Sequence, residues 1–422
     1  MRQGKVRPFE AGEVLELTVG EAVHGGWCVA RPDTPQGGPV LFVRHALPGE
    51  LVRAVVTQAT ARFARADATE ILRAAPQRVA APCPYARPGG CGGCDWQHAS
   101  LPAQRDIKAQ VISQQLRRIA GLERAVTVEP LPGDTAGLGW RTRVRFAVDA
   151  SGRAGLFRHR SHDVVPVSDC LIAHPLVTAA GVTRRGWPGV RWVEVAAAPA
   201  SGERVLLASG EGYPDGPARQ RYLTQRAAGR GWRVSAAGFW QVHPGAADVL
   251  AAAVLDGLRP RPGETALDLF CGAGLFAGVL AEAVGRGGRV IGVERDEAAV
   301  RDARHNLRAT PWARVHRGDA AALLARNGLS GASLAVLDPP RTGIDRRVIG
   351  LLSALSPAGA GRRGSEAALV RRIAYVSCDP ATLARDIAVF SGSGWSLEAL
   401  RAFDAFPMTH HVECLATLAR SG

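Results

Sequence analysis

Short runs in which apolar and polar side chains alternate characterise the first 75 residues. Three such runs, at residues 14–19, 40–43 and 51–56, are separated by glycine and proline turns. Several short strands at this spacing are typical of a small barrel. Residues 1–75 are therefore expected to form an N-terminal β-barrel domain.

From about residue 236 onward, continuous apolar runs alternate with helical stretches, and this alternation predicts a doubly wound, Rossmann-like α/β domain over residues 236–422. The runs that predict buried strands lie at 266–270, 289–293, 334–337 and 373–377. The stretches that predict helices lie at 246–258 and 275–284. A low-complexity segment at 356–366 predicts a flexible loop.

The intervening residues 76–235 show a mixed pattern and are expected to form a central domain, opened by a proline-marked linker. Within it, residues 106–116 predict an amphipathic helix, and the wider helical stretch 96–122 could pack on the α/β domain. The apolar residues that share one face of this helix are Ile107, Val111, Ile112 and Leu116.

A glycine turn follows the first strand of the α/β pattern, in the sequence ALDLFCGAGLF at 266–276. Gly272 and Gly274 leave room for a ligand against bare backbone N–H groups at the start of a helix. Glu294 follows the next strand and is placed to accept two ribose hydroxyls. The third glycine of G-x-G-x-x-G and a G-K-[ST] motif are both missing, which favours an adenosine-containing cofactor over a dinucleotide or a P-loop triphosphate.

Length, composition and charge limit the number of domains, the compartment and the kind of partner. A chain of 422 residues predicts two or three domains, and no apolar stretch approaches the length of a membrane span. The N-terminal sequence lacks an apolar secretory segment, so we expect a soluble, cytoplasmic protein with no membrane partner. The net charge of +14 is almost entirely arginine, because lysine occurs only at Lys5 and Lys108. This surplus favours a polyanionic partner.

A group of arginines and histidines in the central domain could line an RNA-facing surface, or could simply form a solvated face. The group consists of Arg141, Arg143, Arg145, Arg158, Arg160, His159 and His162.

Cysteines cluster in the same domain. Cys83 precedes a C-x-x-C turn made by Cys91 and Cys94, and Cys170 could close the site as a fourth ligand. In a cytosolic chain such a cluster predicts a metal site rather than disulfides. Zinc and an iron–sulfur cluster use the same ligands, so the sequence leaves the metal open.

Three polar residues at strand ends are candidates for chemistry. Cys378 ends an apolar strand just before a helix, whose N-terminus would lower the pKa of the thiol and make it a nucleophile. The alternative is a buried, inert cysteine. Asp338, held by the prolines of Asp-Pro-Pro-Arg, could orient a substrate base, and Glu413 could accept a proton.

The neighbouring His410 and His411 could be metal ligands. If they lie on a strand they point to opposite faces, which disfavours a paired site.

Two resemblances follow from these motifs. Residues 25–31, 41–43 and 47–50 resemble the TRAM domain, an OB-like RNA-binding module. FWQVH, DLFCGAGLF, GVE, DPPR, SCDPATLARD and FPMTHHVEC, in this order, resemble the S-adenosylmethionine-dependent RNA uracil-5-methyltransferases. The CGGC turn and the TRAM-like start resemble the ribosomal-RNA branch of that family, which carries a [4Fe-4S] cluster.

The resemblance implies a nucleophilic Cys378, Glu413 as the proton-abstracting base, and Asp338 at the same site. It implies a cluster bound by Cys83, Cys91, Cys94 and Cys170. The expected S-adenosylmethionine-binding residues are Gln241, Phe270, Gly272, Gly274, Leu275, Glu294, Asp319 and Asp338. The expected partner is structured RNA, 23S ribosomal RNA above all, bound by a monomer.

The chain departs from the family pattern at His243 and Asp379, where asparagine is usual, and at Leu275, where a polar residue is common. The gap between Cys83 and Cys91 is also longer than expected. These departures bear on fine specificity more than on reaction class.

Three alternatives stay open. The ending FPMTHHVEC also resembles the transfer-RNA branch, and a non-catalytic RNA-binding relative could keep the fold. An amino-methylase could use Asp-Pro-Pro-Arg to methylate an exocyclic nitrogen of a nucleic-acid base directly, without a nucleophilic cysteine.

Overall fold

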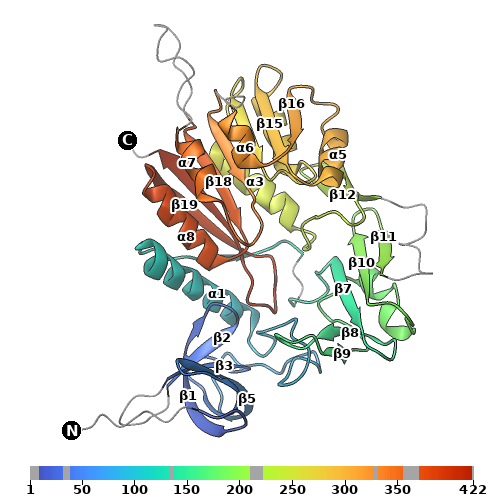
Figure 1. The fold of residues 1–422 in the computed structure, drawn as a ribbon, viewed down its shortest axis with the longest axis vertical. Helices are drawn as coiled ribbons and strands as arrows, with labels where there is room; N and C mark the ends of the chain where they lie inside the picture. The colour runs from blue at the N-terminus through green and yellow to red at the C-terminus, as the bar shows by residue number, and fades with distance from the viewer. Residues whose placement is uncertain are drawn as a thin grey trace.

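The computed structural model describes residues 9–31, 39–133, 136–209, 222–326, 331–354 and 370–420. Figure 1 shows three parts: a barrel at the N-terminal end, a central antiparallel sheet, and a large α/β sheet that includes the C-terminal strands. Within the described ranges, no helix is both long enough and apolar enough to cross a membrane. The low-complexity segment 356–366 lies outside the described residues.

The N-terminal part is a closed five-stranded barrel, which confirms the expectation drawn from the alternating pattern. Its strands run in the order β1-β2-β3-β5-β4. Val52, Ala54 and Val56 of β4 point inward, and the polar residues between them point outward, as a period of two requires. The strands are β1 (Val14–Val23), β2 (Trp27–Ala30), β3 (Val40–Arg44), β4 (Leu51–Ala59) and β5 (Phe63–Arg73).

The central part contains a five-stranded sheet in the order β11-β10-β7-β8-β9, followed by a two-stranded hairpin. The sheet strands are β7 (Arg143–Val148), β8 (Ala154–Phe157), β9 (Val164–Pro166), β10 (Trp192–Ala198) and β11 (Glu203–Ala208). The hairpin is β12 (Tyr222–Ala227) with β13 (Arg230–Ser235), and the short helices are α2 (Pro175–Thr178) and η2 (Val182–Arg184).

The α/β part is an eight-stranded sheet in the order β16-β15-β14-β17-β18-β20-β19-β6. Strands β14 to β18 are parallel, which confirms the doubly wound prediction, and β20 runs antiparallel to β18. Its strands are β6 (Val128–Pro130), β14 (Thr265–Leu269), β15 (Arg289–Glu294), β16 (Ala313–Arg317), β17 (Leu334–Leu337), β18 (Arg372–Ser377), β19 (Trp395–Asp404) and β20 (Glu413–Arg420). Its helices are α3 (Ala246–Leu258), α4 (Leu275–Val284), α5 (Glu297–Asn306), α6 (Ala320–Ala325), α7 (Arg346–Ala354) and α8 (Pro380–Ser391).

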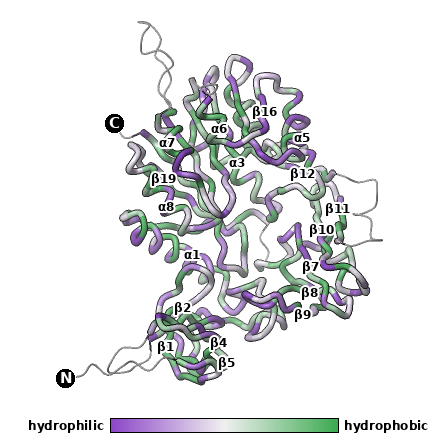
Figure 2. The backbone as a smooth tube through the Cα atoms, viewed as in Figure 1, coloured by the Kyte–Doolittle hydropathy of each residue, from purple (hydrophilic) through white to green (hydrophobic). Residues whose placement is uncertain are grey.

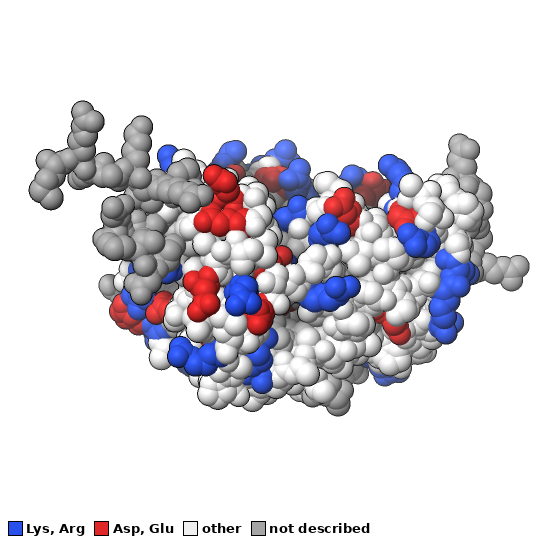
Figure 3. Space-filling model, turned by 90° about the horizontal axis from the view of Figure 1, so that it is seen from below, with Lys and Arg blue, Asp and Glu red and all other residues white. Residues whose placement is uncertain are grey.

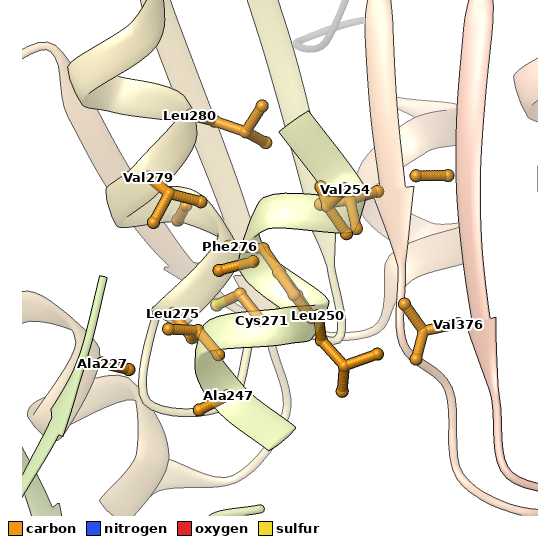
Figure 4. Packing of buried hydrophobic residues seen from close by; sticks show 14 of the residues in the cluster. Ala227, Ala247, Leu250, Val254, Cys271, Leu275, Phe276, Val279, Leu280 and Val376 are labelled. Carbon is orange, nitrogen blue, oxygen red and sulfur yellow. The ribbon is translucent and has the colours of Figure 1, made fainter. Parts of the chain in front are cut away.

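Helices cover both faces of this sheet and bury two separate apolar layers. On one face, α3 and α4 pack against each other. Figure 4 shows Leu250 and Val254 of α3 beside Leu275 and Phe276 of α4. The expected limits of α3 and α4 match the observed limits. Both helices are apolar, and the glycine and charged residues that flank them mark where each helix begins and ends.

Helix α1 (Leu101–Gln115), continued by one π-helical turn η1 (Leu116–Ala120), lies between the barrel and the α/β sheet (Figure 1). Ile107 belongs to the apolar core of the barrel, whereas Ile112 and Leu116 belong to the layer under α8. Figure 2 shows hydrophilic and hydrophobic residues alternating along the coils of α1 and α8. The predicted apolar face of the helix is confirmed, and the same face serves two cores.

Candidate functional site

The glycine turn after β14 leaves an open space at the carboxyl edge of the sheet. Phe270 and Gly272 have left-handed φ values of 69° and 51°, and Gly274 has 89°. A Cβ added at Gly272 would meet no atom within 4 Å, so this backbone is free to approach a ligand. The sequence suggested glycines here but did not reveal that bulky Phe270 also takes the left-handed conformation, which is rare for such a residue.

Glu294 ends β15 directly beside this turn. Its Oε2 accepts a hydrogen bond from the N–H of Gly272 at 3.0 Å, and its Oε1 accepts from the N–H of Asp296 at 2.8 Å. The N–H of Gly318 donates to the backbone oxygen of Glu294, which brings Asp319 to the same edge. Asp319 itself caps α6 by accepting from the N–H of Ala322 at 3.1 Å. Both expected carboxylates therefore flank the glycine turn.

Asp268, which sequence reasoning missed, lies inside β14 beneath the turn. Its Oδ2 accepts a hydrogen bond from the N–H of Ala277 at 2.7 Å, and its Oδ1 is a buried atom without a partner within the described chain. Burial raises the pKa of Asp268 well above its usual value. The available signal was a lone carboxylate in an otherwise apolar strand.

Gln241 and Leu275 are the expected cofactor residues that bury their side chains. Gln241 lies in the loop that follows β13. A hydrogen bond joins this loop to the central part, since the N–H of Thr142 donates to the backbone oxygen of Val242 at 2.9 Å. Leu275 packs into the apolar layer between α3 and α4 (Figure 4), so its side chain contributes packing at the start of α4. Phe239, two residues before Gln241, is 68% exposed.

Cys378 and Glu413 face each other across two paired strands. Ser377 of β18 pairs with Cys414 of β20, and continuing this antiparallel register by one residue places Cys378 opposite Glu413. Asp338 follows the neighbouring strand β17 and interacts electrostatically with both residues. Arg341, from the same Asp-Pro-Pro-Arg segment, acts on both with the opposite sign. The structure thus gathers three of the predicted residues and one further cation at one site.

The electrostatic environment of Cys378 differs from the expectation. Burial, followed by the charge of Glu413, raises the pKa of the Cys378 thiol to about 11, although Arg341 acts to lower it. The prediction that the start of α8 lowers this pKa is wrong, because burial and the charges of Glu413 and Asp338 outweigh the helix terminus.

Burial also raises the pKa values of the two carboxyl groups and so favours their neutral forms. Burial raises the pKa of Asp338 to about 7, and burial followed by the charge of Asp338 raises the pKa of Glu413 well above its usual range. Glu413 is only 4% exposed. A buried carboxyl group with a raised pKa is a stronger base once it is ionised, which suits a group that must take a proton from carbon.

The histidine pair differs from the sequence prediction. The rings of His410 and His411 lie 4.0 Å apart, so the expectation of opposite faces is wrong, because this segment is a turn that precedes β20 and not a strand. His411 Nε2 lies 3.5 Å from Arg341 Nη2, and His410 Nδ1 lies 2.7 Å from Asp95 Oδ2. Asp95, whose pKa falls to about 2 because the bonds from His410 outweigh burial, was not identified from sequence.

Helix α1 fixes the segment that leads to Glu413. Lys108 Nζ donates to Asp404 Oδ1 at 2.6 Å and to the backbone oxygen of Phe406 at 3.0 Å. Gln104 Oε1 accepts a hydrogen bond from the N–H of Met408 at 2.8 Å. A cation and an amide on one helix face therefore hold the turn between β19 and β20, although neither carries a recognisable motif.

The four clustered cysteines line one cavity in the central part, together with Tyr85 and Arg141. The residues are Cys83, Cys91, Cys94 and Cys170, all with free thiols. Burial raises the pKa of Cys170 to about 11, and the charges of the cysteines act on one another. In the described part of the chain, no group of three or more His, Cys, Asp or Glu side chains is arranged so that it could hold a metal ion.

The arginines of the central domain differ in their partners, and the RNA-facing role considered for them stays a prediction. Arg143 binds Glu194 and donates to the backbone oxygens of Ala236 and Gly238, so it serves structure. Arg145 binds the same Glu194. Arg145, Arg158 and Arg160 are exposed, the last two in the turn after β8.

Three family models match successive parts of the chain. Residues 8–69 match the TRAM domain, residues 219–322 match protein-L-isoaspartate(D-aspartate) O-methyltransferase, and residues 331–421 match tRNA (uracil-5-)-methyltransferase. The first match confirms the TRAM-like resemblance of the barrel.

Similar proteins extend over almost the whole chain. A protein of Streptomyces avermitilis named "uncharacterized RNA methyltransferase" is 48% identical over 96% of this chain and 98% of its own length. A Corynebacterium efficiens protein of corresponding name is 33% identical over 97% and 95%. The crystal structure of Pyrococcus abyssi tRNA (uracil-54, C5)-methyltransferase in complex with S-adenosyl-L-homocysteine has a TM-score of 0.68 at 20% identity, over 96% of this chain and 100% of that one. This last likeness is one of fold.

Proposed function

The chain belongs to the RNA methyltransferase family, and from this premise we propose that it methylates carbon 5 of a uridine in structured RNA, with S-adenosylmethionine as the methyl donor. The observation that carries the proposal is the β18–β20 register that sets Cys378 opposite Glu413. A thiol and a carboxyl group across from each other suit covalent activation of a pyrimidine ring, whereas attack through an exocyclic nitrogen needs no such thiol.

The donor would bind at the glycine turn. The open space over Gly272 fits an adenosine group, with Glu294 and Asp319 beside it as the carboxylates that would accept its ribose hydroxyls. Phe270, Gly274, Asp338, Gln241 and the backbone of Leu275 complete the proposed binding residues. S-adenosylmethionine, when bound, supplies an electrophilic methyl group on a sulfonium.

The residues of the chain perform the remaining steps on the uracil. The Cys378 thiol gives its proton to solvent as the base enters, and the thiolate adds to carbon 6, so that the π electrons of the C5–C6 double bond move toward the carbonyl at carbon 4. Arg341 stabilises the thiolate electrostatically. After carbon 5 has taken the methyl group, Glu413 removes the proton from carbon 5. The electrons of the C5–H bond re-form the C5–C6 double bond, and the Cys378 thiolate leaves with the electrons of the bond to carbon 6.

The cysteine cavity is proposed to hold a [4Fe-4S] cluster. Four free thiols lining one cavity supply the type of ligand that a [4Fe-4S] cluster uses, and zinc uses the same type. Iron and sulfide analysis of anaerobically purified protein tests this. Equal amounts of both support it, whereas stoichiometric zinc contradicts it.

The RNA-binding surface is proposed to include the seam between the barrel and the central sheet. Figure 3 shows basic side chains in several separate groups, so total charge alone does not mark the surface. Arg65 of β5 and Arg160 of the turn after β8 both approach the Trp27 ring, with guanidinium carbons 5.6 and 5.7 Å from its centroid. Burial and the charge of Arg160 lower the pKa of Arg65. Arg65 and Arg160 come from two parts of the chain and lie over the same ring, so together they form a positively charged site that suits a phosphate group.

Arg160 also has a left-handed φ of 51°, which is costly for a residue with a Cβ and typical of functional turns. The turn is held in place because the N–H of Gly92 donates to the oxygen of Phe157 at 2.9 Å.

We propose ribosomal RNA, in particular 23S ribosomal RNA, as the substrate, and transfer RNA as the second candidate because residues 331–421 match a tRNA (uracil-5-)-methyltransferase. Digestion of RNA from a deletion strain, followed by mass spectrometry, tests the assignment. Loss of a single 5-methyluridine identifies both the RNA class and the position. If every 5-methyluridine persists, the proposed function is wrong.

A further inference from the structure

A side chain of the N-terminal barrel reaches the residue next to the nucleophile. His24 lies in the turn between β1 and β2, and its Nε2 is 3.2 Å from Oδ2 of Asp379. Asp379 directly follows Cys378. We propose that His24 is a positioning residue for Cys378, so that the barrel completes the active site as well as binding RNA. The inference deepens the proposed function and rests on it for the role of Cys378.

The two carboxylate oxygens of Asp379 contact different groups. Its Oδ1 accepts a hydrogen bond from the N–H of Thr382 at 2.8 Å and so caps α8, while Oδ2 faces His24. Burial acts to raise the pKa of Asp379, but the bonds from His24 and Thr382 outweigh it and hold the pKa below its usual range. Asp379 is therefore a carboxylate beside the thiol, and the imidazole of His24 is the hydrogen-bond partner of its Oδ2.

The same barrel turn also contacts the segment that leads to Glu413. The ring of His24 meets the ring of His410 edge to face at 6.3 Å between centroids. His410 is held by Asp95, whose other oxygen lies 3.2 Å from Arg44 Nη2 of β3. The barrel thus supports both strand ends that carry the reacting groups.

The turn has little freedom to move. A Cβ added at Gly26 would lie 2.8 Å from the Asp95 side chain, so the backbone of the turn packs directly on the segment that holds His410. A side chain presented from such a turn has a fixed position, which a positioning role requires.

His24→Ala should leave Oδ2 of the Asp379 carboxylate without its imidazole partner beside Cys378 and so disfavour the thiolate. We expect alkylation of Cys378 by iodoacetamide, followed by mass spectrometry of its peptide in RNA-free protein, to slow by about threefold to tenfold, because one pKa unit changes a small thiolate fraction tenfold. Single-turnover adduct formation with an RNA containing 5-fluorouridine should slow to a similar extent. RNA affinity in a filter-binding assay should stay within about twofold.

Three further variants sharpen the test. His24→Gln keeps an N–H donor and should recover part of the alkylation rate. Asp379→Asn keeps the helix cap without the charge, so adding His24→Ala to it should change little. His316→Ala, at an exposed position on β16, is the matched control and should alkylate Cys378 as the unmodified protein does.

Wild-type alkylation of Cys378 in His24→Ala overturns the inference, as does a loss of RNA affinity that accounts for the whole loss of adduct rate. Failure of the proposed function looks different. In that case the unmodified protein forms no adduct with the fluorinated RNA, while His24→Ala still slows alkylation.

Discussion

Lys108 and Asp404 form a fully buried ion pair across the interior, with Nζ 2.6 Å from Oδ1 and side chains 1% and 0% exposed. The pair joins helix α1, which lies against the barrel, to the end of β19. The backbone that follows Asp404 leads into the turn before Glu413. A lysine far from any motif therefore holds the segment that leads to Glu413.

Replacing Lys108 by Met should strand the Asp404 carboxylate in the interior and lower the free energy of unfolding by about 3–5 kcal/mol. Urea denaturation followed by circular dichroism measures this. The exposed Gln110→Met on the same helix is the control and should change stability by less than about 0.5 kcal/mol. If Lys108→Met is as stable as this control, the Lys108–Asp404 ion pair does not stabilise the fold, and the expectation drawn from its burial is wrong.

Replacing Cys378 by Ala should abolish both methyl transfer and the covalent complex with 5-fluorouridine RNA, because no other group in the proposed mechanism can activate carbon 5. Denaturing gel electrophoresis detects the complex, and tritium transfer from labelled S-adenosylmethionine measures activity. Cys28→Ala, which removes a buried thiol from the barrel core, should keep both. Methylation by the Cys378 variant would favour the amino-methylase alternative.

The pH dependence of thiol reactivity should reflect the raised pKa of Cys378. An ordinary cysteine has a pKa of 9.0 and this one about 11, so below pH 9 the thiolate fraction is about a hundredfold smaller. Alkylation of the ligand-free protein should therefore keep rising from pH 8 toward pH 11.

Glu413→Gln should move that pH profile to lower pH, because the carboxylate that opposes the thiolate is gone. The same variant should accumulate the RNA adduct, since the proton on carbon 5 stays in place. An unchanged alkylation profile would show that Glu413 and Cys378 do not interact.

Replacing Arg160 by Glu should weaken RNA binding through loss of a phosphate contact. The slope of log affinity against log salt concentration should fall by about one for each phosphate contact removed. Arg65→Glu should weaken RNA binding in the same way. The double variant should lose less binding free energy than the sum of the two single losses, because both arginines lie at the Trp27 ring. Arg153→Glu, an exposed arginine paired with Asp149, is the control. Equal effects from all three positions would contradict a localised site.

Local pattern was enough to predict much of the fold. Alternation along β4 predicted the barrel, and the apolar runs at 334–337 and 373–377 placed Asp338 and Cys378 at strand ends, where they are found. These features depend on period and on short-range turn chemistry, which a single stretch of sequence contains.

Properties that depend on distant parts of the chain were not predicted. The pKa of Cys378 follows from burial and from Glu413 on another strand, so the local helix terminus gave the wrong direction. Likewise, the contact of His24 with Asp379 and that of Lys108 with Asp404 join residues hundreds of positions apart, and neither partner carries a pattern that indicates the other. His410 and His411 were misread because a turn replaces the expected strand.

The short strand β6 has a practical consequence for dissecting this enzyme. It precedes the central sheet in the chain, yet it pairs in parallel with β19 through Ala402 and Val128 at the far edge of the α/β sheet. A recombinant fragment starting near residue 236 would therefore leave β19 with an unpaired backbone edge and α8 without its covering helix. Exposed edges of this kind recruit other chains. Dissection by truncation would yield an aggregating fragment, so point substitutions in the full-length protein are the sounder approach.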